Sequence, residues 1–170
     1  MSNIEILVEN GSKELFEIVC DTNIGILDLR TADCDLQISD ILPTFSKLKN
    51  LGLWGIIVGH CDLQLPASLD CFSLETGECS SEWLSSLLIK LSELDHPVVC
   101  QLRNFVVQAR REDCCANSNN HESHMRSKLL ACDMSNIEIL VENGSKELFK
   151  LFHDTSIGIL DLRTSYCVSH

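Results

Sequence analysis

The most regular feature of the chain is an apolar spacing, L-x-x-L-x-L, whose fourth and sixth positions lie two residues apart. On an extended strand those two side chains point to the same face. The spacing occurs at Met1, Ile4 and Ile6; at Ile24, Leu27 and Leu29; at Leu48, Leu51 and Leu53; at Leu69, Phe72 and Leu74; and at Leu102, Phe105 and Val107. Its starts are 23, 24, 21 and 33 residues apart. An alternative register, with 27-residue spacing, aligns the Cys-Asp-Leu triplets at Cys34 and Cys61.

The segments between these strands carry helix signals. Residues 12–19 begin with a serine cap, and residues 40–48 hold Pro43, which suits a first helical turn. The clearest helix covers residues 81–94, with leucines at helical spacing and Pro97 just beyond its end. One strand cannot bury its apolar face alone, whereas stacked parallel strands with return segments over one face can. The pattern therefore predicts an α/β repeat.

A long duplication repeats the start of the chain. The 34 residues that begin at Met1 recur from Met134, and 27 of the aligned positions are identical. The second copy carries the apolar spacing at Met134, Ile137 and Ile139, and again at Ile157, Leu160 and Leu162. We therefore predict a repeat arc over residues 1–112, a polar linker over 113–133, and a partial duplicate of residues 1–37 over 134–170. A mis-joined reading frame is the alternative origin of the duplicate.

Residues 26–54, ILDLRTADCDLQISDILPTFSKLKNLGLW, resemble two successive leucine-rich repeats. In the second unit Ile24, Leu27, Leu29, Cys34 and Leu36 occupy the positions of the family pattern L-x-x-L-x-L-x-x-N/C-x-L. The chain is most similar to the cytosolic C-terminal repeat arrays of NACHT leucine-rich-repeat immune receptors. The resemblance implies a short irregular solenoid, with parallel strands on the concave face and helices on the convex face, and a non-catalytic protein-binding function, as a fragment or relative of an innate immune sensor.

The first, third and fifth units depart from this pattern. Glu9 stands at the Asn or Cys position of the first unit, and Ile56 stands there in the third. The fifth interval, of 33 residues, is long for the family.

The charge balance narrows the class of partner. The chain has 25 acidic and 13 basic residues and a net charge of −12, which repels nucleic acids and anionic membranes. No apolar run reaches the ~18 residues of a membrane helix, and the start MSNIEILVENGSKE lacks the features of a signal peptide. A cytoplasmic location and a protein partner are therefore expected. Without polar caps at the terminal units, we also expect self-association or a missing neighbour.

Few residues indicate chemistry. The chain has no nucleophile elbow, H-E-x-x-H helix or C-x-x-C pair, so neither an enzyme nor a cofactor is predicted. Its ten cysteines are expected to be reduced and to act mostly as small core residues. The alternative is a thiol-based redox or metal-binding protein that uses the segment 114–124. Cys114, Cys115, His121 and His124 offer zinc ligands there, but adjacent cysteines lack the usual spacer, so no metal site is predicted.

The outward strand positions form the predicted recognition surface. The candidate binding residues are Glu5, Asp28, Arg30, Asn50, Trp54 and Glu75. Trp54 either anchors a partner or packs against a neighbouring loop. The carboxylates at positions 5, 28 and 75 would make the face acidic and favour a basic partner, unless they are simply solvated.

Overall fold

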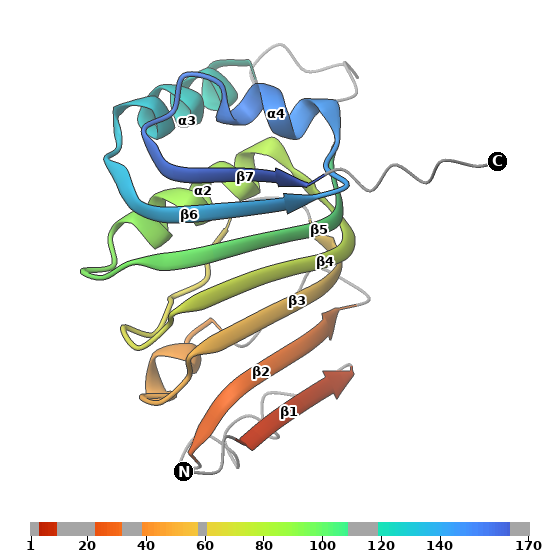
Figure 1. Ribbon diagram of the computed structural model, residues 1–170, viewed down its shortest axis with the longest axis vertical. Helices are drawn as coiled ribbons and strands as arrows, with labels where there is room; N and C mark the ends of the chain where they lie inside the picture. The colour runs from red at the N-terminus through yellow and green to blue at the C-terminus, as the bar shows by residue number, and fades with distance from the viewer. Residues whose placement is uncertain (1–3, 10–22, 32–38, 58–60, 109–118, 164–170) are drawn as a thin grey trace, which may run out of the picture.

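The computed structural model describes residues 4–9, 23–31, 39–57, 61–108 and 119–163, and the statements below concern that part of the chain. It forms an α/β structure with one all-parallel sheet, whose seven strands follow one another in chain order (Figure 1). The strands are β1 (Ile4–Glu9), β2 (Ile24–Thr31), β3 (Asn50–Ile57), β4 (Cys71–Ser80), β5 (Val98–Gln108), β6 (Met134–Glu142) and β7 (Ile157–Arg163). The helices are η1 (Leu42–Thr44), α2 (Ser81–Ser92), α3 (Asn119–Ala131) and α4 (Lys146–Phe152).

The register of the sheet places the buried aliphatic side chains in columns across the strands. Leu27 pairs with Leu51, Leu51 with Phe72, and Phe72 with Cys100. A second column runs two residues further along, through Leu29, Leu53, Leu74 and Leu102. These residues are at most 3% exposed and belong to one hydrophobic core. The 23-to-24-residue register predicted for the second to fourth units is therefore confirmed, and the alternative 27-residue register is wrong.

The predicted registers of the first and fifth units are wrong. In the first unit Ile6 and Val8, rather than Ile4 and Ile6, pair with Leu27 and Leu29. The strand alternates apolar and polar residues throughout, so its pattern fits two registers that differ by two residues.

In the fifth unit the residues aligned with Phe72 and Leu74 are Cys100 and Leu102, rather than Phe105 and Val107. Both predicted residues are buried, but they follow Asn104, a left-handed residue (φ 49°) at which the buried side chains change from even to odd positions. A linear spacing rule does not contain that change.

The helices lie behind the sheet in Figure 1 and cover one of its faces. The predicted helix over residues 81–94 is confirmed as α2, whose leucine stripe is buried and whose first turn is capped by the Ser80 hydroxyl, 3.1 Å from the Trp83 amide. The Ser145 hydroxyl caps α4 in the same way, 3.3 Å from the Leu148 amide. The helix predicted over residues 12–19 lies outside the described residues.

The loop predicted within residues 113–133 is wrong where the chain is described, because α3 occupies Asn119–Ala131. Met125 and Leu129 lie one helical turn apart and are 5% and 0% exposed, and α3 packs against α2. Two apolar side chains were enough to attach an otherwise polar helix to the core. The duplicate is part of the same sheet, since β6 pairs with β5 and β7 pairs with β6.

Successive strands carry a left-handed residue at nearly the same level of the sheet. Gly55, Thr76, Asn104 and Asn143 all have positive φ, between 47° and 126°. The Asn143 side chain donates to the Asn104 side-chain oxygen over 2.8 Å, which links two of these bends. At the bend of β4, a Cβ on Gly77 would collide with the backbone carbonyl of Gly55. The bends therefore rely on glycine where two backbones approach most closely.

Replacing Gly77 with alanine should destabilise the fold. The added methyl group must displace the β3 backbone rather than a flexible side chain, a change that typically costs about 1–3 kcal/mol. Urea unfolding should show a lower midpoint for Gly77→Ala, whereas Ser46→Ala, at an exposed turn, should leave it unchanged. Equal midpoints for the two variants would contradict this account of the bend.

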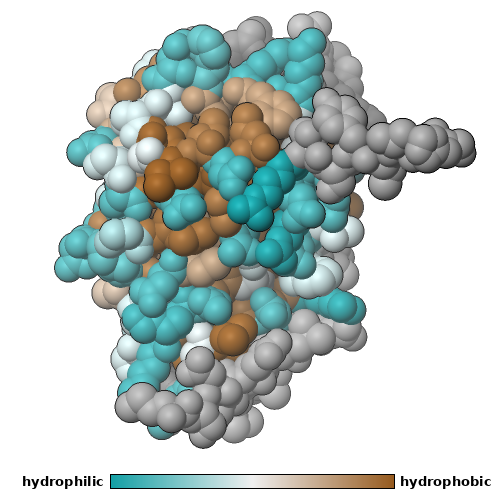
Figure 2. Space-filling model, in the orientation of Figure 1, coloured by the Kyte–Doolittle hydropathy of each residue, from teal (hydrophilic) through white to brown (hydrophobic). Residues whose placement is uncertain are grey.

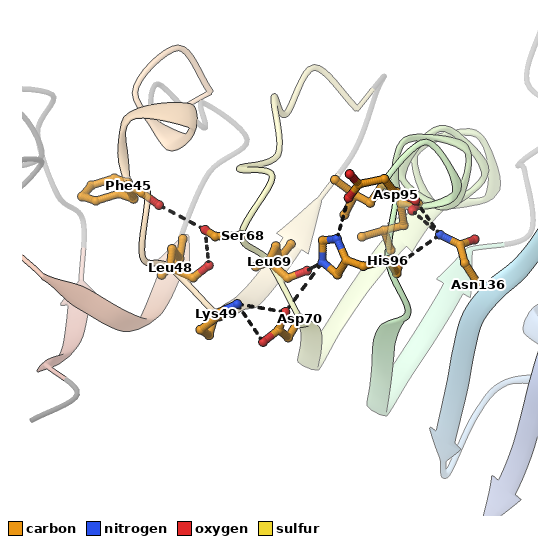
Figure 3. A network of polar contacts seen from close by, with 11 residues as sticks. Phe45, Leu48, Lys49, Ser68, Leu69, Asp70, Asp95, His96 and Asn136 are labelled. Carbon is orange, nitrogen blue, oxygen red and sulfur yellow. Dashed lines mark hydrogen bonds and ion pairs between the residues drawn. The ribbon is translucent and has the colours of Figure 1, made fainter. Parts of the chain in front are cut away.

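A polar network joins the turns that precede β4, β5 and β6 (Figure 3). The His96 ring contacts the Asp95 carboxylate through Nδ1 (3.1 Å) and the Leu69 carbonyl through Nε2 (2.8 Å). The Asn136 amide donates to the Leu94 carbonyl (2.9 Å) at the end of α2. Because both ring nitrogens face acceptors, the protonated form is favoured, and the pKa of His96 is raised above 6.5, first by Asp95 and then by the Leu69 carbonyl.

This network predicts a pH dependence of stability. A histidine whose pKa is raised on folding stabilises the folded state fully below its unfolded pKa of 6.5, and this contribution is lost as the pH rises through the folded value. The free energy of unfolding, measured in urea at a series of pH values, should therefore fall over that window relative to His96→Gln. A constant difference between the two proteins across the window would refute the assignment.

Candidate binding surface

The face of the sheet opposite the helices carries the alternate strand residues. All six predicted binding residues occupy strand positions of this open face, since the register aligns Glu5 with Ile26, Ile26 with Asn50, and Asp28 with Gly52. The remaining three, Arg30, Trp54 and Glu75, follow one another in a single row across β2, β3 and β4.

That row continues across the rest of the sheet. Its members, which we call the charged row, are Arg30, Trp54, Glu75, Arg103, Glu142 and Arg163, one from each strand from β2 to β7. Arg103 Nη1 lies 3.1 Å from Glu75 Oε1, and Arg103 Nε lies 3.7 Å from Glu142 Oε2. Exposed pairs of this kind add at most about 1 kcal/mol each, so they orient the side chains more than they stabilise the fold.

Trp54 is held in the charged row by its neighbour. The Arg30 guanidinium carbon lies 5.2 Å from the centroid of the indole ring, within the range of a cation–π contact. The side chain is half-buried on the open face. Trp54 is thus pre-ordered and still partly accessible, which combines the two alternatives that the sequence left open.

An apolar patch adjoins the charged row. It is formed by Cys71, Val99, Leu140 and Ile159, which are half-buried except for Ile159, at 56% exposed. Val99 pairs with Cys71 and with Glu138, and Leu140 lies two residues along β6 from Glu138, so the four apolar side chains surround that carboxylate. Figure 2 shows hydrophobic side chains gathered on this side of the molecule, bordered by hydrophilic ones.

Sequence reasoning missed the half of this surface that β5, β6 and β7 contribute. Arg103 was hidden by the incorrect register of the fifth unit. Glu142 and Arg163 lie in the duplicate, whose placement relative to the first copy no sequence signal specified. The signal that could have located them is the alternation Val98, Cys100, Leu102, which puts Arg103 on the outward side.

The open face is not uniformly acidic. Its described positions on β2 to β7 include Asp28, Glu75, Glu138, Glu142 and Asp161, against three arginines at 30, 103 and 163. In the charged row the signs alternate from Glu75 to Arg163. A purely basic partner is therefore a poor match, and one that presents both charges beside apolar side chains is a better one.

The described cysteines are free thiols with little nucleophilic character. Burial raises the pKa of Cys61 to about 11 and that of Cys100 to about 12, and it raises the pKa of Cys79 as well. A thiol that stays protonated at neutral pH is a weak nucleophile and a weak metal ligand. These three residues fit the core-packing interpretation of the cysteines.

The zinc alternative involves residues that are largely outside the described part. Cys114 and Cys115 lie outside it, and His124 is exposed on α3. Among the described residues, no three histidine, cysteine or acidic side chains are grouped so that they could hold a metal ion. None of the described helices is long and apolar enough to cross a bilayer.

Comparison with protein families, with curated proteins and with solved structures found no match to this chain.

Thiol reactivity should follow burial. With iodoacetamide at about pH 8, Cys61, Cys79 and Cys100 should react only after urea unfolding, because the thiolate is scarce and shielded in the fold. Cys71 and Cys132, which are half-buried, should react earlier. Peptide mass spectrometry over a time course measures each site, and rapid labelling of Cys79 in the native protein would instead favour thiol chemistry.

Proposed function

We propose that this chain is a cytoplasmic leucine-rich-repeat solenoid that binds a protein partner without catalysis, through the open face of its sheet. It would be a fragment or relative of the cytosolic repeat arrays of NACHT leucine-rich-repeat immune receptors. Parallel strands in chain order, helices on one face and aliphatic columns in register support the architecture. Each repeat then contributes one short segment to a continuous surface.

The charged row carries the functional proposal. Six successive strands each place one charged or aromatic side chain at the same level, beside a patch of partly exposed apolar residues. Interfaces are typically built from aromatic and arginine side chains around an apolar centre with a polar rim. The partner we propose is a protein segment that covers the patch with apolar side chains and offers both a carboxylate and a basic group to the row.

The recognition test uses a displayed random-peptide library selected against the wild-type chain. Trp54→Ala should weaken the selected peptides by about 30-fold, the loss expected for an interface hot spot of about 2 kcal/mol. Arg103→Glu should also weaken them, because it reverses the charge at the centre of the row. Fluorescence anisotropy measures the affinities, and circular dichroism verifies that each variant folds.

Lys128→Glu is the matched control for charge reversal, since Lys128 is exposed on α3 and away from the open face. It should leave peptide affinity unchanged. Peptides that tolerate both Trp54→Ala and Arg103→Glu but fail on Lys128→Glu would refute the open face as the recognition surface.

A further inference from the structure

The free edge of β7 exposes side chains that are buried in an identical strand elsewhere in the chain. β2 and β7 share the sequence Ile-Gly-Ile-Leu-Asp-Leu-Arg. Leu27 and Leu29 on β2 are 0% and 3% exposed, whereas their counterparts Leu160 and Leu162 on β7 are 40% and 49% exposed. The sheet therefore contains both a covered and an uncovered form of the same strand.

The neighbours on the other side of the two strands are alike. Ile6 pairs with Leu27 in the first copy, and Ile139 pairs with Leu160 in the second. The difference lies on the opposite edge, where β2 is paired with β3 and β7 is the last strand of the described sheet. The first copy thus shows which structure covers this edge.

The cover on β2 is a parallel strand together with the turn that precedes it. Leu51 and Leu53 align with the two β2 leucines, and Lys49 donates its amide to the Gly25 carbonyl over 2.9 Å. In the preceding turn Leu42, Phe45 and Leu48 are at most 1% exposed and join the same core. Residues 39–57 therefore form a compact apolar unit that fits the edge.

Two positions make the fit selective. Gly52 lies opposite Asp28, and a Cβ at this position would collide with the aspartate carboxylate. Trp54 lies opposite Arg30 and receives its guanidinium. A covering strand consequently needs glycine between its two leucines and an aromatic residue after them.

β7 carries the same two selective side chains on its open face. Asp161 and Arg163 occupy the positions of Asp28 and Arg30. Arg163 is directed at its own strand, with Nε and Nη2 each 2.9 Å from Asp161 Oδ2. This pair is exposed and therefore inexpensive to separate, so the arginine can turn to an arriving aromatic ring.

We propose that the free edge of β7 is a docking site for a parallel β-strand with the pattern leucine, glycine, leucine, aromatic residue, carried on a turn like that of residues 39–57. Main-chain hydrogen bonds to the open edge would supply part of the affinity, and alternate side chains would supply the selectivity. This site is separate from the proposed recognition surface, and either can fail without the other.

The test uses the full chain and a fluorescein-labelled peptide that copies residues 39–57. Fluorescence anisotropy should show saturable binding to the wild-type protein. Leu162→Asp, which places a charge at the apolar edge, should weaken binding at least about tenfold. Val106→Asp is the matched control, because Val106 is also an exposed apolar strand residue (44%) but lies on the internal strand β5, and it should retain binding.

Peptide variants test the selectivity. Changing the glycine at position 52 to valine in the peptide should abolish binding, and changing the tryptophan at position 54 to alanine should weaken it. Binding that survives Leu162→Asp would overturn the proposal, as would no binding of the parent peptide. Self-association of the chain that Leu162→Asp abolishes, without peptide binding, would also overturn it and would assign the edge to a second copy.

Discussion

The structure depends on burying two alternate apolar side chains from each strand against helices that cover only one face of the sheet. Because side chains alternate along a strand, a slip of one residue would turn every buried leucine outward. The columns through Leu27, Leu51 and Phe72 therefore fix how all other residues on these strands are oriented. The opposite face is left for polar and partly exposed groups, and the charged row is a direct result of the same register.

The left-handed residues give this sheet a second regular feature. Each bend at Gly55, Thr76, Asn104 and Asn143 comes directly after a member of the charged row. The row consequently lies where the strands change direction, and Gly77 allows neighbouring backbones to approach at that level. The bends also explain why the even-numbered alternation of buried residues in β5 ends at Leu102 and resumes at Phe105.

The distribution of polar and apolar groups is that of a surface for contact more than of a site for chemistry. The described thiols with the most strongly raised pKa values belong to the core, while the arginines and carboxylates are paired on an accessible face. The two proposals use different parts of the sheet. One concerns the face that six strands build together, and the other concerns the edge where the stacking of strands stops in the described chain.

The sequence by itself determined the local elements and much of the face. Alternating leucines around positions 27, 51 and 72 specified three strands, their register and the outward direction of Asp28, Trp54 and Glu75, because strand periodicity is a local property. The stripe of α2 and its serine cap were equally local.

The tertiary structure alone decided which residues of the first and fifth strands align, that α3 packs on α2, and that the duplicate extends the same sheet. A register of two-residue steps is degenerate in sequence, a backbone bend changes the alternation without an apolar signal, and the position of a repeated segment depends on which neighbour buries it. Arg103, Glu142 and Arg163 joined the charged row only through these long-range pairings.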